Sequence, residues 1–360
     1  MKNELNWLLA IVFCAGVFTA CTSEDDNAVR PATPVVEVDI NETNFPDENF
    51  RRFLLEQDYG KDGMLTSAEI ASITVMDIAK KDIESLKGIE FFTALDTLDC
   101  FDNYLDVLDV SKNVALRELI CAANVLTALD VSKNKKLEIL YCGFNYLTSL
   151  DVSKNSALTD LSCGSNELTA LDVSKNSALT ELSCDENKLT TLDVSKNSAL
   201  TDLSCDVNKL TALDVSKNSA LTTLSCSSNE LTTLDVSKNS ALTKLYCSGN
   251  ELTTLDVSKN SALTNLYCAG NKLTELVIPS NSPLSTLFLS RNKISGKNMD
   301  DLISSLPQNT SSERHMFAVI DNLDGDEENV FTKSQSDAVK AKGWLPVYWD
   351  EKDKEWKELD

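Results

Sequence analysis

The stretch Leu150–Cys163 reads LDVSKNSALTDLSC, and Leu171–Cys184 reads LDVSKNSALTELSC, so the chain restates almost the same residues after a step of 21. Cysteines keep this step at positions 100, 121, 142, 163, 184, 205, 226, 247 and 268. Each has a leucine two residues before it and an asparagine three residues after it. An internal repeat of this length predicts a solenoid, in which each repeat forms one coil and buries its apolar side against the next coil.

The repeat unit, L-x-x-L-x-C-x-x-N-x-L-T-x-L-D-V-S-K-N-x-A, also predicts which side chains face inward. Alternate residues of a strand point to the same side, so Leu161 and Cys163 should enter the core while Asp160 and Ser162 face outward. Stacked coils should then form parallel strands about 4.8 Å apart. Asparagines recur in two rows, at 103–292 and at 113–281, and we expect their amides to satisfy backbone groups left unpaired at the turns.

This unit resembles the leucine-rich repeat L-x-x-L-x-L-x-x-N-x-L, with cysteine at the third leucine until Leu289 restores it. The nested form is similar to the 21-residue bacterial class called IRREKO, and the whole resembles internalin-like surface proteins. The resemblance implies an α/β solenoid of about ten coils with parallel β ladders over residues 83–294. Residues 35–82 should form a helical N-terminal cap and residues 295–360 a small αβ C-terminal cap.

The repeated cysteines admit three interpretations. Free cysteine is among the most buried residue types, so we expect a ladder of inert buried thiols. Disulfide bonds between repeats are a less favoured interpretation, because the number of repeat cysteines is odd and neighbouring parallel strands rarely offer the required geometry. A metal site formed by these cysteines is the least favoured interpretation, because a single row presents no tetrahedral set of ligands.

The N-terminal segment predicts export. Residues 1–20 contain the apolar run Trp7–Ala20, which is too short to span a bilayer and fits a signal peptide. Small residues before Cys21 and the acidic TSEDD after it resemble the lipoprotein signals of Bacteroidota. The resemblance implies lipidation at Cys21, an acidic tether over 21–34 and an outer-membrane lipoprotein exposed on the cell surface. Membrane contact would run through the lipid alone, and a plain cleaved signal peptide is the alternative.

The N-terminal cap contains DYGKDGMLTSAE, Asp58–Glu69, which resembles an EF-hand calcium loop. The resemblance assigns Asp58, Asp62, the Met64 carbonyl and Glu69 as ligands. Gly60 occupies position 3, where a carboxylate or amide is usual, so calcium affinity should fall to about 10⁻⁴–10⁻³ M. The alternative is a metal-free cap that keeps only the turn.

At the other end, spacing predicts a helix over Met299–Leu306 and a strand over His315–Ile320. Thr332 with Gln335 predicts a capping box at the start of a second helix, and a last strand should begin at Trp344.

Composition and charge limit the classes of function that we expect of this protein. A net charge of −23 disfavours nucleic acid, and a single histidine, His315, disfavours histidine-based catalysis. Aspartates repeated at 109–256 and lysines at 112–259 are expected to form a solvated face. The variable outward positions carry aromatics towards both ends of the array and carboxylates in the middle. These are the candidate binding residues: Phe101, Tyr141, Phe144, Tyr146, Asp160, Glu181, Asp185, Asp202, Asp206, Tyr246, Tyr267 and Phe288.

We therefore predict a non-enzymatic surface binding or adhesion protein, because exposed aromatics serve as binding anchors. The ligand would be an unidentified protein or glycan. One alternative is a glycan-active hydrolase that uses acidic residues such as Asp185 and Asp206. The other is a structural spacer without a ligand.

Overall fold

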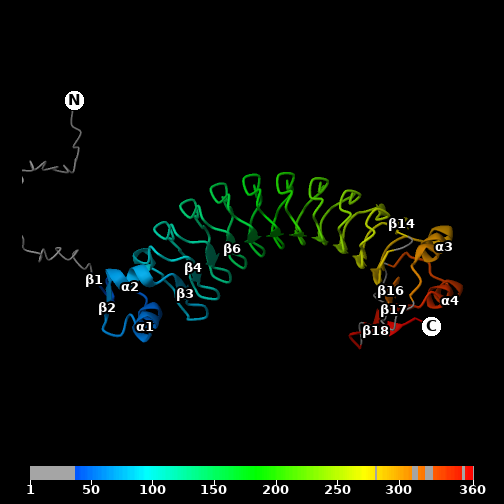
Figure 1. Cartoon of the computed structure of the whole chain (residues 1–360). Helices are drawn as coiled ribbons and strands as arrows, with labels where there is room; N and C mark the ends of the chain where they lie inside the picture. Colours follow the sequence, from blue (N-terminus) through cyan, green and yellow to red (C-terminus); the bar gives the residue numbers. More distant parts are fainter. Residues whose placement is uncertain (1–36, 280–281, 310–314, 321–326, 351–352, 360) are drawn as a thin grey trace, which may run out of the picture. The chain divides into compact units, whose positions relative to one another are not determined.

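A computed structural model describes residues 37–279, 282–309, 315–320, 327–350 and 353–359, all within one compact unit (Figure 1). The predicted signal peptide (1–20), Cys21 and the tether (21–34) lie outside these residues.

One large sheet organises the described residues. Its strands lie in the spatial order β18-β17-β16-β15-β13-β11-β10-β9-β8-β7-β6-β5-β4-β3. The sheet lines the inner side of the curved coil stack, which we call the concave face (Figure 1). Its strands are β3 (Val75–Asp77), β4 (Thr97–Asp99), β5 (Glu118–Ile120), β6 (Ile139–Tyr141), β7 (Asp160–Ser162), β8 (Glu181–Ser183), β9 (Asp202–Ser204), β10 (Thr223–Ser225), β11 (Lys244–Tyr246), β13 (Asn265–Tyr267), β15 (Thr286–Phe288), β16 (His315–Ala318), β17 (Trp344–Asp350) and β18 (Glu355–Glu358).

Pairing along the repeats is parallel, with a register of one repeat. Asp160 of β7 lies opposite Glu181 of β8, which lies opposite Asp202 of β9. A second, two-stranded parallel ladder joins β12 (Thr254–Asp256) to β14 (Glu275–Val277) in the back halves of two coils. The predicted parallel ladders and solenoid of about ten coils are confirmed.

The core follows the predicted inward positions. Leu158, Leu161, Cys163, Leu168 and Val173 have no exposed surface. All nine repeat cysteines are free and fully buried, so the predicted ladder of buried thiols is confirmed. Burial raises the pKa of every one of these thiols, because a thiolate would lose its hydration there.

The front asparagine row links neighbouring coils. Asn166 Nδ2 donates to the carbonyls of Cys142 and Cys163 at 3.0 and 3.1 Å, and its Oδ1 accepts the N–H of Leu147 at 2.9 Å. Both ends of the buried amide therefore have partners, as predicted for this row.

In the back asparagine row, the Nδ2 groups have the predicted backbone partners but the Oδ1 atoms do not. Asn176 Nδ2 donates to the carbonyls of Val152 and Asn155, but its Oδ1 has no hydrogen-bond partner among the described residues. The same holds for the other asparagines of this row from 113 to 260.

The N-terminal cap contains two short helices and one antiparallel pair of strands. Asp47 caps α1 (Glu48–Glu56), and β1 (Glu37–Asp39) pairs antiparallel with β2 (Met64–Thr66), which leads into α2 (Ser67–Ser72). The sheet of the solenoid already begins at β3, before the predicted boundary at residue 83, and a short 3₁₀ helix, η1 (Ile89–Phe91), follows in the first coil.

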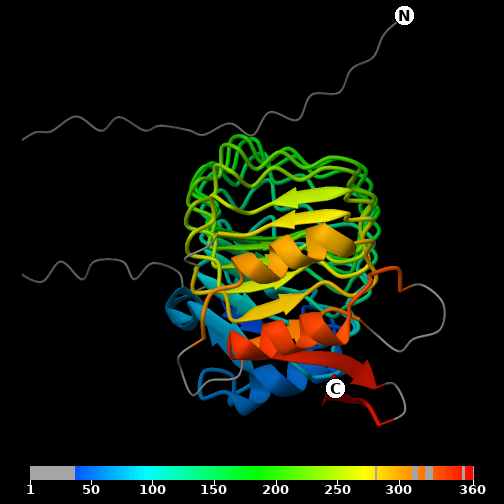
Figure 2. The same cartoon turned by 90° about the vertical axis from the view of Figure 1, so that its right-hand side faces the viewer.

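The C-terminal cap extends the same sheet. Helices α3 (Gly296–Ser305) and α4 (Lys333–Ala341) pack against β14 and β17, and Figure 2 shows both helices at this end of the stack. The predicted helices, the strand at His315 and the capping box of Thr332 with Gln335 are all present. Strand β18 pairs antiparallel with β17 and was not expected from the sequence.

Candidate functional site

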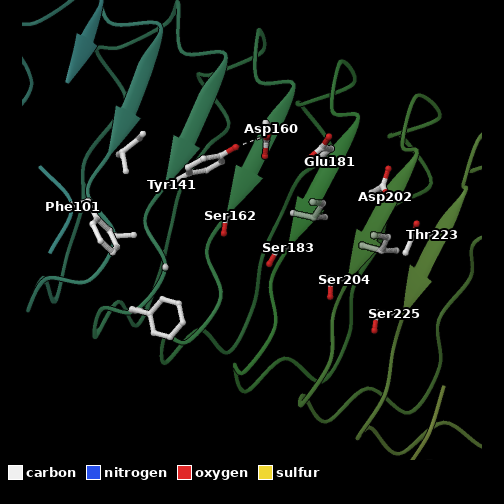
Figure 3. Close-up of a pocket in the computed structure, with 16 residues that line it drawn as sticks. Phe101, Tyr141, Asp160, Ser162, Glu181, Ser183, Asp202, Ser204, Thr223 and Ser225 are labelled. Atoms are coloured by element: carbon white, nitrogen blue, oxygen red, sulfur yellow. Dashed lines mark hydrogen bonds between the residues drawn. The ribbon is translucent and has the colours of Figure 1, made fainter. Parts of the chain in front are cut away.

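A groove of about 520 Å³ lies on the concave face, along strands β5 to β10 (Figure 3). Three kinds of side chain line the groove. An apolar wall includes Phe101 and Phe144, a carboxylate row consists of Asp160, Glu181 and Asp202, and small residues form the floor. The lining residues are Phe101, Ile120, Ala122, Tyr141, Gly143, Phe144, Asp160, Ser162, Glu181, Leu182, Ser183, Asp202, Leu203, Ser204, Thr223 and Ser225.

The floor results from a change at one repeat position. The residue before each cysteine is Tyr141 in β6 and Tyr246 in β11, but it is serine in the four strands between them. Small side chains between two tyrosines leave room above the sheet, and the groove lies over these serines. The serines are Ser162, Ser183, Ser204 and Ser225.

The carboxylate row consists of Asp160, Glu181 and Asp202, which are cross-strand neighbours about 4.8 Å apart. The charge of Asp160, more than burial or the charge of Asp202, raises the pKa of Glu181. Within the described residues, none of the three forms an ion pair. The row is therefore a site of uncompensated negative charge, which a cation would stabilise.

Tyr141 joins the apolar wall to this row. Its hydroxyl donates to Asp160 Oδ2 at 2.8 Å, and this bond, reinforced by burial, raises the pKa of Tyr141 to about 12 (Figure 3). The ring therefore stands in a defined position at one end of the serine floor.

Asp185 and Asp206, two of the predicted binding residues, form hydrogen bonds within the array. Asp185 Oδ1 accepts from Ser204 Oγ at 2.6 Å and from the N–H of Asp206 at 2.8 Å, while its Oδ2 accepts from Ser183 Oγ. Asp206 accepts from Ser225 Oγ and from the N–H of Ser227 in the same way. These carboxylates link neighbouring coils by hydrogen bonds. Burial raises the pKa of Asp206, although the hydrogen bonds that it accepts act to lower this pKa.

The aromatics at the far end form a stack of their own. Tyr246, Tyr267 and Phe288 stack in sequence, with centroids 4.8 and 4.7 Å apart. Trp356 of β18 meets Phe288 edge-on, a contact that the sequence did not reveal because it joins the cap to the array. The ring faces of Tyr267 and Phe288 are covered by their neighbours, and none of the three lines the groove.

Two further predicted residues lie at the turn that follows β6. Phe144 is 67% exposed and lines the groove, whereas Tyr146 is 57% exposed and lies outside its lining. The structure thus brings Phe101, Tyr141 and Phe144 together with the carboxylate row and separates them from the C-terminal stack.

The predicted calcium loop has the helix–turn–strand–helix order of an EF-hand, but its carboxylates have other contacts. Glu69 accepts from the N–H and hydroxyl of Thr66 at 2.8 Å in a capping box, and Asp58 pairs with Lys61. No three His, Cys, Asp or Glu side chains in the described parts of the chain are grouped to hold a metal. A Cβ at Gly60 would lie 2.0 Å from the Leu54 carbonyl oxygen, which explains the glycine at this position.

Cysteine-bearing coils, parallel ladders and an asparagine row define this protein as a leucine-rich repeat solenoid. No protein-family model matches the chain, and no curated protein matches it. No helix in the described residues is long and apolar enough to cross a membrane.

Similar solved structures include an internalin and other leucine-rich repeat proteins. The internalin InlF of Listeria monocytogenes is 20% identical with a TM-score of 0.64, over 85% of this chain and 96% of that one. A leucine-rich repeat protein of Leptospira interrogans is 22% identical with a TM-score of 0.64, over 76% and 72%. The functional domain of InlJ from Listeria monocytogenes, which includes a cysteine ladder, is 28% identical with a TM-score of 0.42, over 79% and 82%.

Proposed function

We propose that this protein is a non-enzymatic binding protein whose groove holds a positively charged, extended segment of another protein. The observation that carries the proposal is the carboxylate row of Asp160, Glu181 and Asp202, which lies uncompensated beside an apolar wall. Lysine or arginine side chains of a partner would neutralise the row, and apolar side chains would pack on Phe101 and Phe144.

The dimensions of the groove suit a polypeptide. From Tyr141 to Ser225 the floor crosses four strand steps, roughly 19 Å. An extended chain of about six residues covers this distance. The partner segment would run across the strands, so successive side chains would meet successive coils.

A glycan is the less favoured ligand. Most sugars are uncharged, so a glycan would leave the carboxylate row of the groove uncompensated, and outside the groove the faces of Tyr267 and Phe288 are already covered by their neighbours. The hydrolase alternative based on Asp185 and Asp206 is disfavoured, because the acceptor oxygens of these two carboxylates bind neighbouring hydroxyl and N–H groups.

The test begins with arrayed peptides that vary in Lys, Arg and aromatic content, probed with the purified protein. The best peptide is then titrated by fluorescence anisotropy against wild type and Glu181→Gln, which keeps the shape and removes the central charge. We expect Glu181→Gln to weaken binding about fivefold, with a smaller loss at high salt. Glu275→Gln is the control, because Glu275 of β14 is an exposed carboxylate that does not line the groove.

Equal binding of neutral and basic peptides, or an unchanged affinity in Glu181→Gln, would contradict the proposal. If no peptide binds at all, the structural spacer becomes the better interpretation.

We further propose that the protein acts on the cell surface as an outer-membrane lipoprotein, which supports an adhesive role. The sequence around Cys21 supports this location. Cys21→Ala should release the protein from the membrane fraction, and persistence in that fraction would argue against the lipid anchor. Labelling intact cells with a membrane-impermeant reagent tests surface exposure separately.

A further inference from the structure

One coil differs from its neighbours in its back half. Six coils carry the sequence SKNSAL, but residues 132–137 read SKNKKL, with Lys135 and Lys136 in place of serine and alanine. The turn is otherwise the same. The N–H of Asn134 reaches the Val131 carbonyl at 3.0 Å, and in the next coil the N–H of Asn155 reaches Val152 at the same distance. The two lysines are therefore not needed to build the coil.

These lysines help to form a cleft away from the groove. A cleft of about 640 Å³ is lined by Lys133, Lys135, Lys136 and Lys154, together with Val114 and Ser132. The four lysines are exposed, and within the described residues none of their ammonium groups forms an ion pair. We call this feature the lysine cleft.

The charge in the lysine cleft is not balanced locally. Asp130 and Asp151 offset Lys133 and Lys154, as the equivalent aspartates do in the other coils from Asp109 to Asp235, and each of the two also accepts a serine N–H at 2.8 Å. Among the residues that the structure describes, no aspartate or glutamate forms an ion pair with Lys135 or Lys136.

The nearest acidic residue along the chain does not change this balance. Glu138 follows Lys136 by two positions but is held by Arg117 at 2.7 Å. The cleft thus keeps two surplus positive charges in a chain whose net charge is −23.

We propose that the lysine cleft is a binding site for a phosphate-bearing anion with two or more negative charges. Lysine is a compact point charge that binds phosphate oxygens without the planar geometry that arginine requires. Four ammonium groups around one cleft repel one another, and a multivalent anion relieves this repulsion. At physiological ionic strength the Debye length is about 8 Å, so the distant carboxylates oppose binding only weakly.

The shared chemistry is a phosphate oxyanion, presented either by a soluble phosphate-rich molecule or by a lipid headgroup. The site is independent of the groove on the concave face, because no residue is common to the two linings.

The decisive variant is Lys135→Ser/Lys136→Ala, which restores the SKNSAL sequence of six other coils and should therefore fold normally. Inorganic tripolyphosphate is titrated into full-length protein by calorimetry at 50 and 300 mM NaCl. Wild type should bind, more weakly at high salt, and the double variant should bind about tenfold more weakly. Lys217→Ser/Lys238→Ser removes the same charge from other coils and should bind as wild type does.

A gain of binding gives a second test. Ser177→Lys/Ala178→Lys places the same pair two coils further along and should add a second site for tripolyphosphate. Co-sedimentation with phosphatidylglycerol vesicles, compared with phosphatidylcholine vesicles, separates the two sources. Retention that depends on Lys135 and Lys136 supports a lipid headgroup, and tripolyphosphate binding without retention supports a soluble ligand.

The proposal is overturned if wild type does not bind tripolyphosphate at 50 mM NaCl. It is also overturned if the two double variants that remove lysines lose affinity equally, because binding would then follow net charge and not the cleft.

Discussion

Replacing one asparagine from each row tests how the coils are held together. Asn166→Ala and Asn176→Ala remove the same side chain from buried sites ten residues apart in the array. The volume lost is identical, so the cost of the cavity should be similar in both variants. The difference between them then reports the hydrogen bonds alone.

The bonds predict an unequal loss. In Asn166→Ala the carbonyls of Cys142 and Cys163 keep other asparagine donors, but the buried N–H of Leu147 loses its acceptor. A buried N–H left without a partner costs about 1–3 kcal/mol. In Asn176→Ala the carbonyls of Val152 and Asn155 keep backbone N–H donors, and an unpaired amide oxygen disappears.

Asn166→Ala should therefore be less stable than Asn176→Ala by about 1–3 kcal/mol. The measurement is urea unfolding of both variants, followed by far-ultraviolet circular dichroism under identical conditions. Because the sites lie in neighbouring half-coils, they share the same local cooperativity even if the array does not unfold in one step. Equal unfolding midpoints, or a lower midpoint for Asn176→Ala, would refute the reasoning.

Three further predictions follow from the core and the N-terminal cap. The nine repeat thiols should resist alkylation in the folded protein, because they are buried and burial raises their pKa. After denaturation without reductant all nine should react, and mass spectrometry that found a disulfide between repeats would contradict this prediction. Gly60→Ala should lower the melting temperature of the cap, at a cost of about 1–3 kcal/mol, because the new Cβ meets the Leu54 carbonyl. Millimolar calcium should raise the melting temperature of wild type but not of Asp58→Asn, which leaves the capping box of Glu69 intact. An equal response of both proteins in calorimetry would mean that the loop is only a turn.

The sequence alone determined the architecture of the array. A step of 21 residues places the equivalents of Leu161 and Cys163 inward in successive coils. This follows from the alternation of side chains along a strand and from the stacking of nearly identical units. Local signals were also sufficient in the caps, where the spacing of Thr332 and Gln335 predicted a capping box that the structure contains. Such features depend on neighbours within a few residues or on exact repetition, and both can be read along the chain.

Tertiary structure decided what the outward side chains do. Asp185 and Asp160 are both carboxylates at variable outward positions, but Asp185 binds groups one coil away while Asp160 lines the groove. The stack of Tyr246, Tyr267 and Phe288 ends on Trp356 because β18 folds back against β17. These roles arise from contacts between residues that are 19 or more positions apart, and the side chain alone does not specify which of its neighbours it will meet. The repeat determines where each side chain emerges, and the packing of coils and caps determines whether it remains available to a ligand.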